Sequence, residues 1–204
     1  MKEITILGGG GHCYALISLI NSCNTYKPVV IFDKNPSVDE ILGVPVKKRT
    51  KEISLETPVA IAIGYNSVRK RIAEKLTVAC PAFIHKTAVV YPSASLGKGV
   101  QVLPNAVVDA CVTLGDFTIV NCNATVSHNT VVEAYCHIAI NAAVSGGCTI
   151  GEGTIVGAGS VILPEINVGK WVTIGAGAVV TKNVPDGATV VGNPAKIIKK
   201  THEQ

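Results

Sequence analysis

The chain has 204 residues, enough for one large domain or two small ones with real hydrophobic cores. Hydrophobic residues make up 48% of it and aromatic residues only 4%, which suits a narrow interior that admits Val, Ile and Ala but few rings. The net charge of +4 is modest and mostly dispersed, which argues against nucleic acid as a partner and leaves a small polyanion such as a nucleotide compatible.

Residues 1–80 alternate apolar strands with helical patterns. This alternation predicts a first domain built on a small parallel βαβ sheet, half of a dinucleotide-type fold. Ligands of such sheets bind at the carboxyl ends of the strands, so the turns after the strands are candidate sites. The strands are expected at residues 4–7, 29–32 and 59–63, and the helices at residues 15–20 and 67–76.

The turn after the first strand is glycine-rich and runs from Gly8 to His12. Such a strand-to-helix turn offers free backbone N–H groups to a phosphate at the positive end of the helix. The run departs from GxGxxG, because His12 and Cys13 stand where the third glycine is expected. A tight structural turn or another phosphate ligand therefore stays open beside a nicotinamide cofactor.

The other two turns carry polar residues. Asp33 and Lys34 follow the second strand, and Gly64, Tyr65 and Asn66 follow the third. Two interpretations stand side by side for the third turn: a ligand contact, or the start of a helix with Asn66 as its N-cap.

The rest of the chain repeats with a period of six. Every sixth residue from Ile84 to Val180 is aliphatic, over seventeen consecutive positions, and the residue four places later is small or β-branched throughout. This period fits neither a helix nor a hairpin sheet, and it predicts a parallel β-helix whose inward residues stack into one core. We therefore expect a second domain over residues 81–204. The period breaks after Val180, and residues 190–196 resemble the capping segment that closes many solenoids of this repeat type.

The seven cysteines form no CxxC pair and show no metal-like spacing. We expect reduced thiols, with Cys136 and Cys148 in the core, and no bound metal. The N-terminus passes directly into a strand, and no apolar run reaches membrane-spanning length. The sequence therefore predicts a cytoplasmic protein without a membrane partner.

One corner of the predicted coils could support acyl transfer. Three hexapeptides make one coil, so residues 18 apart stack, and Gly146 lies one coil above His128. The imidazole can take a proton from an attacking amine, and the glycine N–H can hold the developing oxyanion. A lone exposed histidine on a repeat corner is more often without function, so the spacing alone leaves both interpretations open.

The chain as a whole resembles a known family. A short βαβ domain with a histidine in its Gly-rich turn, followed by uninterrupted hexapeptide repeats, is similar to the bacterial nucleotide-sugar N-acetyltransferases of the bacillosamine type. The sialic-acid O-acetyltransferases form a related branch. The resemblance implies a left-handed β-helix, acetyl-CoA as co-substrate, and acetylation of the 4-amino group of a nucleotide-linked amino-deoxy sugar.

The resemblance also implies a homotrimer with an active site shared between subunits. A single prism of this kind would leave flat faces exposed, with apolar residues such as Val107, Ile119 and Val131 partly bare. Closed assembly around a threefold axis would cover them.

The family's catalytic motif is a histidine, an acidic neighbour, and a second histidine nine residues on. His128 and His137 match the two histidines, which implies a general base at His128 and a contact of His137 near the thioester of acetyl-CoA. Gly146 matches the glycine whose N–H polarises the acetyl carbonyl. Asn129 stands where the acidic residue is expected. An amide can orient an imidazole, but it stabilises the imidazolium cation less than a carboxylate does. Asn129 therefore favours an amine acceptor, which needs less activation than a hydroxyl.

Binding roles follow from the same resemblance. In the first turn, Gly9, Gly10, Gly11 and His12 would bind the phosphates of the sugar nucleotide. In the second turn, Asp33 and Lys34 would contact its base and ribose. In the third turn, Gly64 and Asn66 would complete the pocket. Four small corner residues would leave room for the pantetheine arm of CoA: Gly157, Ala158, Gly175 and Ala176. Lys182 or Lys196 would pair with the CoA phosphates. A carboxylate in place of the missing acidic neighbour would come from Glu133, Asp109 or a neighbouring subunit.

Three alternatives stay open. Within the family, the acceptor is a hydroxyl of sialic acid or of another sugar or amino acid. A zinc carbonic-anhydrase-like β-helix needs three converging histidines, and His85, His128 and His137 are spaced out of phase for that. A solenoid that only binds or supports would not need the first domain with its Gly-rich turn.

Overall fold

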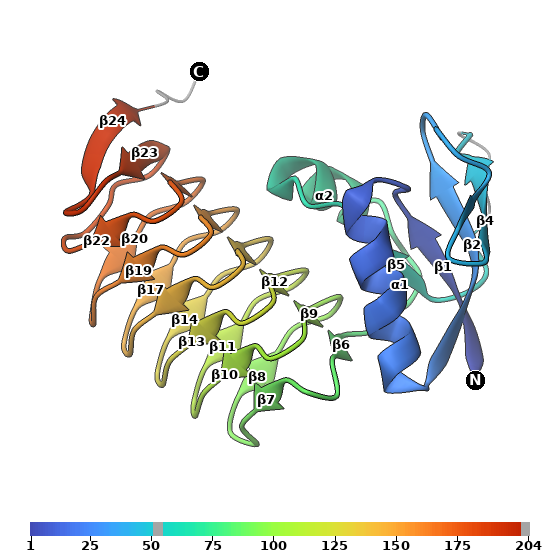
Figure 1. Ribbon diagram of the computed structural model, residues 1–204, viewed down its shortest axis with the longest axis horizontal. Helices are drawn as coiled ribbons and strands as arrows, with labels where there is room; N and C mark the ends of the chain where they lie inside the picture. The colour runs from blue at the N-terminus through green and yellow to red at the C-terminus, as the bar shows by residue number, and fades with distance from the viewer. Residues whose placement is uncertain (51–54, 201–204) are drawn as a thin grey trace.

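The computed structural model describes residues 1–50 and 55–200, and within them two parts lie side by side (Figure 1). The first is a five-stranded sheet with two helices, and the second is a parallel β-solenoid that rises away from it toward the C-terminus. Both agree with the predicted fold class, a βαβ unit followed by a β-helix of hexapeptide repeats. Among the described residues, no helix has the length and apolar character needed to cross a membrane.

The sheet of the first part is mainly parallel, as predicted. β1 (Lys2–Leu7) pairs with both β2 (Tyr26–Asp33) and β5 (Val59–Ile61). α1 (Gly11–Cys23) connects β1 to β2, and α2 (Asn66–Ala73) follows β5. The last four residues of β1 are all buried, as expected for a central parallel strand that is covered on both faces.

The structure adds two strands that the sequence pattern does not predict. β3 (Glu40–Ile41) and β4 (Val44–Lys48) form a hairpin whose turn residues, Leu42 and Gly43, have positive φ. β4 lies parallel to β2, which gives the order β3-β4-β2-β1-β5. These strands are too short and too charged to form a recognisable apolar run, so pairing with β2 supplies what local propensity lacks.

The solenoid is built from strands of two residues, with neighbours in each sheet 18 residues apart, for example Val107 beside Thr125. Its three sheets make three faces. Face A contains β6 (Phe83–Ile84), β9 (Gln101–Val102), β12 (Ile119–Val120), β15 (His137–Ile138), β18 (Ile155–Val156) and β21 (Thr173–Ile174). Face B contains β7 (Val89–Val90), β10 (Val107–Val108), β13 (Thr125–Val126), β16 (Ala143–Val144), β19 (Val161–Ile162) and β22 (Val179–Val180). Face C contains β8 (Ser95–Leu96), β11 (Thr113–Leu114), β14 (Val131–Val132), β17 (Thr149–Ile150) and β20 (Asn167–Val168).

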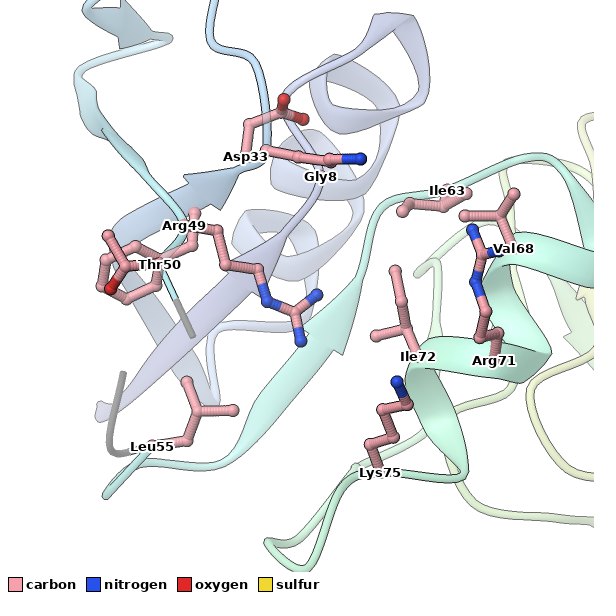
Figure 2. A pocket seen from close by; sticks show the side chains of 12 residues that line it. Gly8, Asp33, Arg49, Thr50, Leu55, Ile63, Val68, Arg71, Ile72 and Lys75 are labelled. Carbon is pink, nitrogen blue, oxygen red and sulfur yellow. The ribbon is translucent and has the colours of Figure 1, made fainter. Parts of the chain in front are cut away.

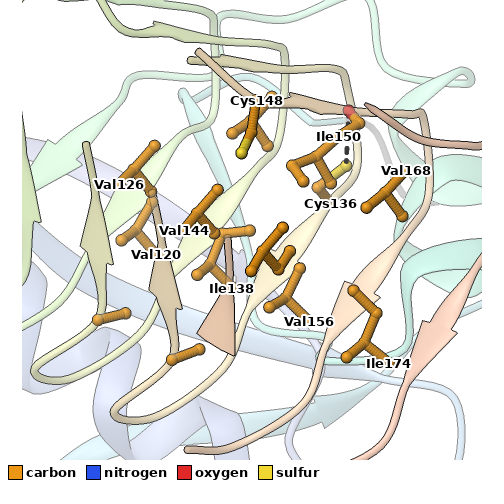
Figure 3. Packing of buried hydrophobic residues seen from close by; sticks show 14 of the residues in the cluster. Val120, Val126, Cys136, Ile138, Val144, Cys148, Ile150, Val156, Val168 and Ile174 are labelled. Carbon is orange, nitrogen blue, oxygen red and sulfur yellow. Dashed lines mark hydrogen bonds between the residues drawn. The ribbon is translucent and has the colours of Figure 1, made fainter. Parts of the chain in front are cut away.

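The aliphatic residue of each repeat points inward and forms the core. From Val102 to Val180 these residues are at most 2% exposed, and Figure 3 shows how their side chains stack. Ile84, in the first coil, is 39% exposed because no coil lies below it. Cys136 and Cys148 are buried in the same core, and all seven cysteines are free thiols, as expected.

At each edge of the prism, one residue per coil takes the left-handed conformation. Gly and Asn adopt this conformation at the lowest cost, but other residue types also occupy it here. On the B–C edge, between faces B and C, these residues are Cys111, Asn129, Gly147 and Glu165. On the C–A edge they are Gly99, Phe117, Tyr135, Gly153 and Trp171, and the rings of Phe117 and Tyr135 stack with centroids 5.8 Å apart. We call this second row the aromatic edge.

The C-terminal residues close the solenoid, as predicted for a capping segment. β23 (Ala188–Val191) continues face A beside β21 and pairs antiparallel with β24 (Lys196–Lys200). Val190 of β23 is only 2% exposed and belongs to the solenoid core.

The first part docks on face A. α1 lies between its own sheet and the solenoid (Figure 1), and its Leu16 and Ile20 share a buried cluster with Phe83 and Ile119 of face A. Ile119 is completely buried, so the expectation that it is partly bare is wrong. The reason is that the first part covers the lower coils of this face, which a repeat pattern cannot reveal.

Arg69 of α2 locks this arrangement. Its side chain is 0% exposed, and its guanidinium donates hydrogen bonds to Phe117 O, Tyr135 O and Cys136 O of the solenoid. It also donates to the carbonyls of Ile63 and Gly64 and to Asn66 Oδ1 in the first part. Burial lowers the pKa of the guanidinium to about 10, which leaves it charged at neutral pH. A planar fork of five donors suits this set of carbonyls.

We expect Arg69→Leu to lower the free energy of unfolding by at least about 3 kcal/mol, because it leaves several buried carbonyls without a donor. Chemical denaturation would measure the change. Arg71→Leu is the matched control, because Arg71 is an exposed arginine of the same helix and its loss should cost within about 0.5 kcal/mol. Equal effects of the two substitutions would contradict the role of Arg69.

Candidate active site

A cavity of about 510 Å³ opens where the carboxyl ends of β1, β2 and β5 meet face A. We call it the turn cavity. It brings the three predicted turns together with residues of the solenoid face, among them Gly11, His12, Asp33, Gly64 and His137. A site at the carboxyl edge of the sheet agrees with the sequence prediction.

The Gly-rich turn leaves backbone N–H groups without a side-chain cap, but not every residue predicted for the turn faces the cavity. Gly10 precedes the first residue of α1 without a side-chain cap, so the helix start keeps N–H groups for a ligand. Gly9 N–H instead donates to Asp33 Oδ2 over 2.7 Å, and Asn35 N–H donates to Asp33 Oδ1 over 2.8 Å. Gly9 and Asp33 therefore brace each other, and Gly10, Gly11 and His12 line the cavity.

A second cavity, of about 620 Å³, adjoins the turn cavity through Gly8, Asp33 and Ile63. We call it the basic cavity. Figure 2 shows side chains of Arg49, Arg71 and Lys75 around it, and Lys34 also lines it. In the part of the chain that the structure describes, none of these four cations has an ion-pair partner. A concave surface with unpaired positive charge suits an anionic ligand.

Two histidines lie at the interface of the turn cavity. His12 Nε2 is 2.8 Å from Gln101 Oε1 of face A, and His137 Nε2 is 3.0 Å from Asn121 Nδ2. Burial is the main cause that lowers the pKa of both, to about 4 for His137, where the Arg69 charge adds to the effect. Both rings are therefore neutral at physiological pH and add no positive charge to the cavity.

His128 stands elsewhere, on the B–C edge, exposed to solvent. Its imidazole packs against Gly146, where an added Cβ would come within 2.7 Å of His128 Nε2. Among the described residues, nothing accepts a hydrogen bond from Gly146 N–H, although Gly147 N–H is bonded to His128 O. The predicted pairing of an imidazole with a free glycine N–H is thus present in the geometry.

The surroundings of His128 narrow the choice of a supporting group. Asn129 Nδ2 lies 3.5 Å from His128 Nδ1, at the outer limit of a hydrogen bond. Asn129 also occupies a left-handed corner position, with φ 58°, which gives Asn a backbone reason to be there. Glu133 accepts from Glu152 N–H, and Asp109 accepts from Ala110 N–H, so both carboxylates have partners of their own.

The residues expected to bind CoA divide between two edges. Lys182 lies on the same edge as His128, three coils above it, which is roughly 14 Å at about 4.8 Å per coil. Ala158 and Ala176 are exposed on the A–B edge. Gly157 and Gly175 also have a packing reason to be glycine, since an added Cβ would strike Ile174 O at 2.4 Å and Val191 Cγ1 at 2.7 Å. The lack of a side chain at Gly157 lets the next coil pack closely above it, and at Gly175 it lets β23 pack closely.

The third turn binds the solenoid as well as the cavity. Asn66 is the first residue of α2 and not its N-cap, which is Tyr65. Its Nδ2 donates to Gly153 O over 2.9 Å, and its Oδ1 accepts from Arg69. Asn66 therefore ties α2 to the aromatic edge, and Gly64 and Tyr65 are the residues of this turn that line the cavity.

Sequence reasoning finds Lys34 of the basic cavity but misses its other cations, Arg49, Arg71 and Lys75, and it also misses Arg69 and Gln101. One signal was available: Arg71 and Lys75 lie four residues apart, the spacing of one helix face. The spacing of Phe117, Tyr135 and Trp171, which lie 18 and 36 residues apart, also indicates a special edge. No local signal distinguishes Arg69 from the charged residues that flank it.

The comparisons with known proteins cover both parts of the chain. A model described as the PglD N-terminal domain matches residues 3–76, and one described as bacterial transferase hexapeptide (six repeats) matches residues 129–164 and 147–182. The acetyltransferase domain of PglB from Neisseria gonorrhoeae FA1090, solved with acetyl coenzyme A, is 37% identical, with a TM-score of 0.91 over 97% of this chain and 99% of that one. The chain belongs to this family of hexapeptide-repeat acetyltransferases.

Two further relatives extend the family. PerB from Caulobacter crescentus, solved with CoA and GDP-perosamine, is 33% identical, with a TM-score of 0.89 over 97% of each chain. The UDP-N-acetylbacillosamine N-acetyltransferase of Bacillus subtilis is 36% identical over 112 residues, and the match covers 52% of its length. The chain thus spans about half of this curated relative. The resemblance inferred from the repeats is confirmed, and acetyl-CoA is the co-substrate with which the family is seen.

Metal chemistry gains no support from the geometry. In the described ranges, no group of three or more His, Cys, Asp or Glu side chains is placed to hold an ion. His128 lies on the B–C edge and His137 on face A, so the chain does not bring them together as ligands of one metal.

We expect the His137 imidazole to stay neutral until the pH falls to about 4, which a pH titration of its NMR signals would measure. The folded pKa lies below the ordinary value of 6.5. The neutral ring therefore stabilises the fold above pH 6.5, and this stabilisation is lost as the pH falls from 6.5 toward 4. His137→Gln assigns the signals and should remove that part of the pH dependence of unfolding. A midpoint near 6.5 would contradict the burial of this ring.

Proposed function

We propose that the protein transfers the acetyl group of acetyl-CoA to the 4-amino group of a nucleotide-linked amino-deoxy sugar, in surface-glycan biosynthesis. The observation that carries the proposal is His128 packed against Gly146, whose N–H has no acceptor in the described part of the chain. Two relatives with TM-scores of 0.89 and 0.91, PerB solved with CoA and GDP-perosamine and the PglB acetyltransferase domain solved with acetyl-CoA, support the substrate class.

The proposed reaction is direct transfer. The amine attacks the thioester carbonyl, and the oxyanion that forms is held by Gly146 N–H. His128 Nε2 takes a proton from the attacking nitrogen. As the C–S bond breaks, this proton passes to the departing sulfur, which leaves CoA as the thiol and the sugar as an acetamide. A C–N bond replaces the C–S bond, and nothing is oxidised or reduced.

Asn129 sets the strength of the base. For His128 to take a proton at Nε2, its Nδ1–H must face an acceptor, which is the amide oxygen of Asn129 after a half-turn of the amide. A neutral amide stabilises the imidazolium less than a carboxylate does. An amine acceptor needs less activation than a hydroxyl, so this arrangement favours N-acetylation.

We propose a homotrimer in which face B turns toward the threefold axis. The outward residues of this face are mostly small and apolar: Val89, Val107, Thr125, Ala143, Val161 and Val179. A ring of three such prisms is a closed heterologous assembly. It places the B–C edge of one copy, with His128, beside the A–B edge of the next.

This assembly would complete the site. The A–B edge carries Ala158 and Ala176, and its Asn121 contacts His137 in the turn cavity. CoA would then lie between the two edges, with Lys182 of one copy near its phosphates. The nucleotide sugar would enter the turn cavity and basic cavity of the next copy. His128 on one copy and the Gly-rich turn on its neighbour would meet the same sugar.

The direct test is release of free CoA thiol from acetyl-CoA with UDP-, dTDP- and GDP-linked 4-amino-4,6-dideoxy sugars. We expect turnover of one of them by the wild type, and a loss of at least about 100-fold in His128→Ala, in the range of general-base catalysis. Asn129→Asp should change the rate only a few-fold.

Three outcomes would count against this proposal. Turnover in His128→Ala equal to that of the wild type would show that His128 is not the general base. A many-fold gain of N-acetylation in Asn129→Asp would show that the amide limits the amine reaction. Acetyl-CoA binding without turnover of any amino sugar would favour a hydroxyl acceptor such as sialic acid.

The trimer is tested by charging face B. We expect the double substitution Val107→Glu and Val161→Glu to give a folded monomer that has lost acetyl transfer, because carboxylates buried between prisms are costly. Analytical ultracentrifugation would measure the mass. Thr113→Glu is the matched control, since Thr113 is an exposed outward residue of face C, and it should leave mass and activity unchanged. An active monomer would overturn the shared site.

A further inference from the structure

Gln101 is a polar residue that is buried on the outer side of face A. It points outward from face A between Phe83 and Ile119, and all three are nearly or fully buried under the first part. Gln101 itself is 2% exposed. A buried carboxamide costs free energy unless its groups are bonded, so its partners carry information.

The partners of Gln101 fix which way its amide points. Its Nε2 donates to Ile61 O, at the end of the edge strand β5, over 2.8 Å. A carbonyl can only accept, so the nitrogen must face Ile61, and Oε1 is left to face His12 at 2.8 Å. An amide oxygen can only accept in turn, so His12 carries its proton on Nε2. Its Nδ1 then holds a lone pair.

That lone pair faces open space. Among the described residues, no hydrogen bond reaches His12 Nδ1, and no side-chain nitrogen or oxygen is both buried and unpartnered. The open space that His12 lines is the turn cavity. His12 therefore presents a neutral acceptor to whatever occupies this cavity.

His137, the other histidine of the cavity, differs in this respect. Asn121 Oδ1 accepts from Cys122 N–H over 2.8 Å, so Asn121 Nδ2 donates to His137 Nε2. Because Nε2 accepts this bond, the neutral ring of His137 carries its proton on Nδ1 and can only donate there. His12 is therefore the histidine of this pair that offers the cavity an acceptor.

We propose that His12, positioned by Gln101, accepts a hydrogen bond at Nδ1 from a hydroxyl or amino group of the sugar, and does not hold phosphate. The inference rests on the proposed function for the presence of a nucleotide sugar. Phosphate oxygens are acceptors, and a neutral imidazole with its lone pair toward them has nothing to donate. Phosphate would instead be held by the N–H groups at the start of α1 and by the cations of the basic cavity.

The proposal predicts different effects of a His12 substitution on two ligands that differ only in the sugar: weaker binding of the sugar conjugate and unchanged binding of the bare diphosphate. We would measure calorimetric Kd values of UDP, dTDP and GDP and of their 4-amino-4,6-dideoxy sugar conjugates. For the pair that the wild type binds, His12→Ala should weaken the conjugate by about tenfold, as for a lost hydrogen bond in a buried site. The bare diphosphate should bind within about twofold of the wild type. A purely structural role would weaken both alike.

Three variants sharpen the test. Gln101→Met keeps the size of the side chain but frees His12 to change tautomer, so it should weaken the conjugate in the same selective way. His12→Asn can place an amide oxygen near the Nδ1 position and should restore part of the affinity. His85→Ala removes a histidine outside both cavities and should change neither ligand.

Several outcomes would overturn the proposal. These are equal weakening of diphosphate and conjugate in His12→Ala, selective weakening of the diphosphate, or a wild type that binds no conjugate more tightly than its diphosphate. Binding is measured without turnover, so a wild type that discriminates the sugar through His12 but transfers no acetyl group would sink the proposed function alone.

Discussion

The arrangement of this molecule depends on a buried guanidinium that bonds to the main chain of both parts. Arg69 donates to carbonyls in two coils of the solenoid and to the turn that follows β5. Carbonyl oxygens at prism corners are fixed by the coil backbone, so the fork of Arg69 meets a rigid surface. A side chain with this many partners allows one position of α2 relative to the solenoid, and with it one position of the turn cavity.

Around Arg69, the interface combines hydrogen-bonded polar side chains with a cluster of buried apolar side chains. α1 brings aliphatic residues to face A, while Gln101, Asn66 and Asn121 each use a carboxamide to read a backbone group and orient a neighbour. Fully satisfied networks of this kind specify one geometry, because every alternative leaves a buried polar group without a partner. The two histidines in the cavity take defined tautomers as a consequence.

The solenoid separates its tasks by face and edge. Face A carries the first part, face B is small and apolar on the outside, and the B–C edge presents His128 and Gly146. Within one chain, the candidate base and the turn cavity lie on different sides of the prism. A threefold arrangement resolves this separation without any change in the chain, because edges that are distant in one prism become neighbours between two.

The six-residue period was sufficient to predict the solenoid and the stacking of Gly146 over His128, whereas the capping segment was expected from the likeness of the tail to such segments. A repeat determines how each side chain points relative to its own coil, and that relation is local. Which residues of a solenoid face are covered by the first part of the chain is not a local property. Ile119 and Gln101 look like ordinary outward residues, Arg69 looks like one charge among several, and Asn66 looks like a helix cap. Only the tertiary structure shows that all four are buried or bonded at one interface. The physical reason is that burial and hydrogen bonding at this interface depend on surfaces brought together from residues tens of positions apart.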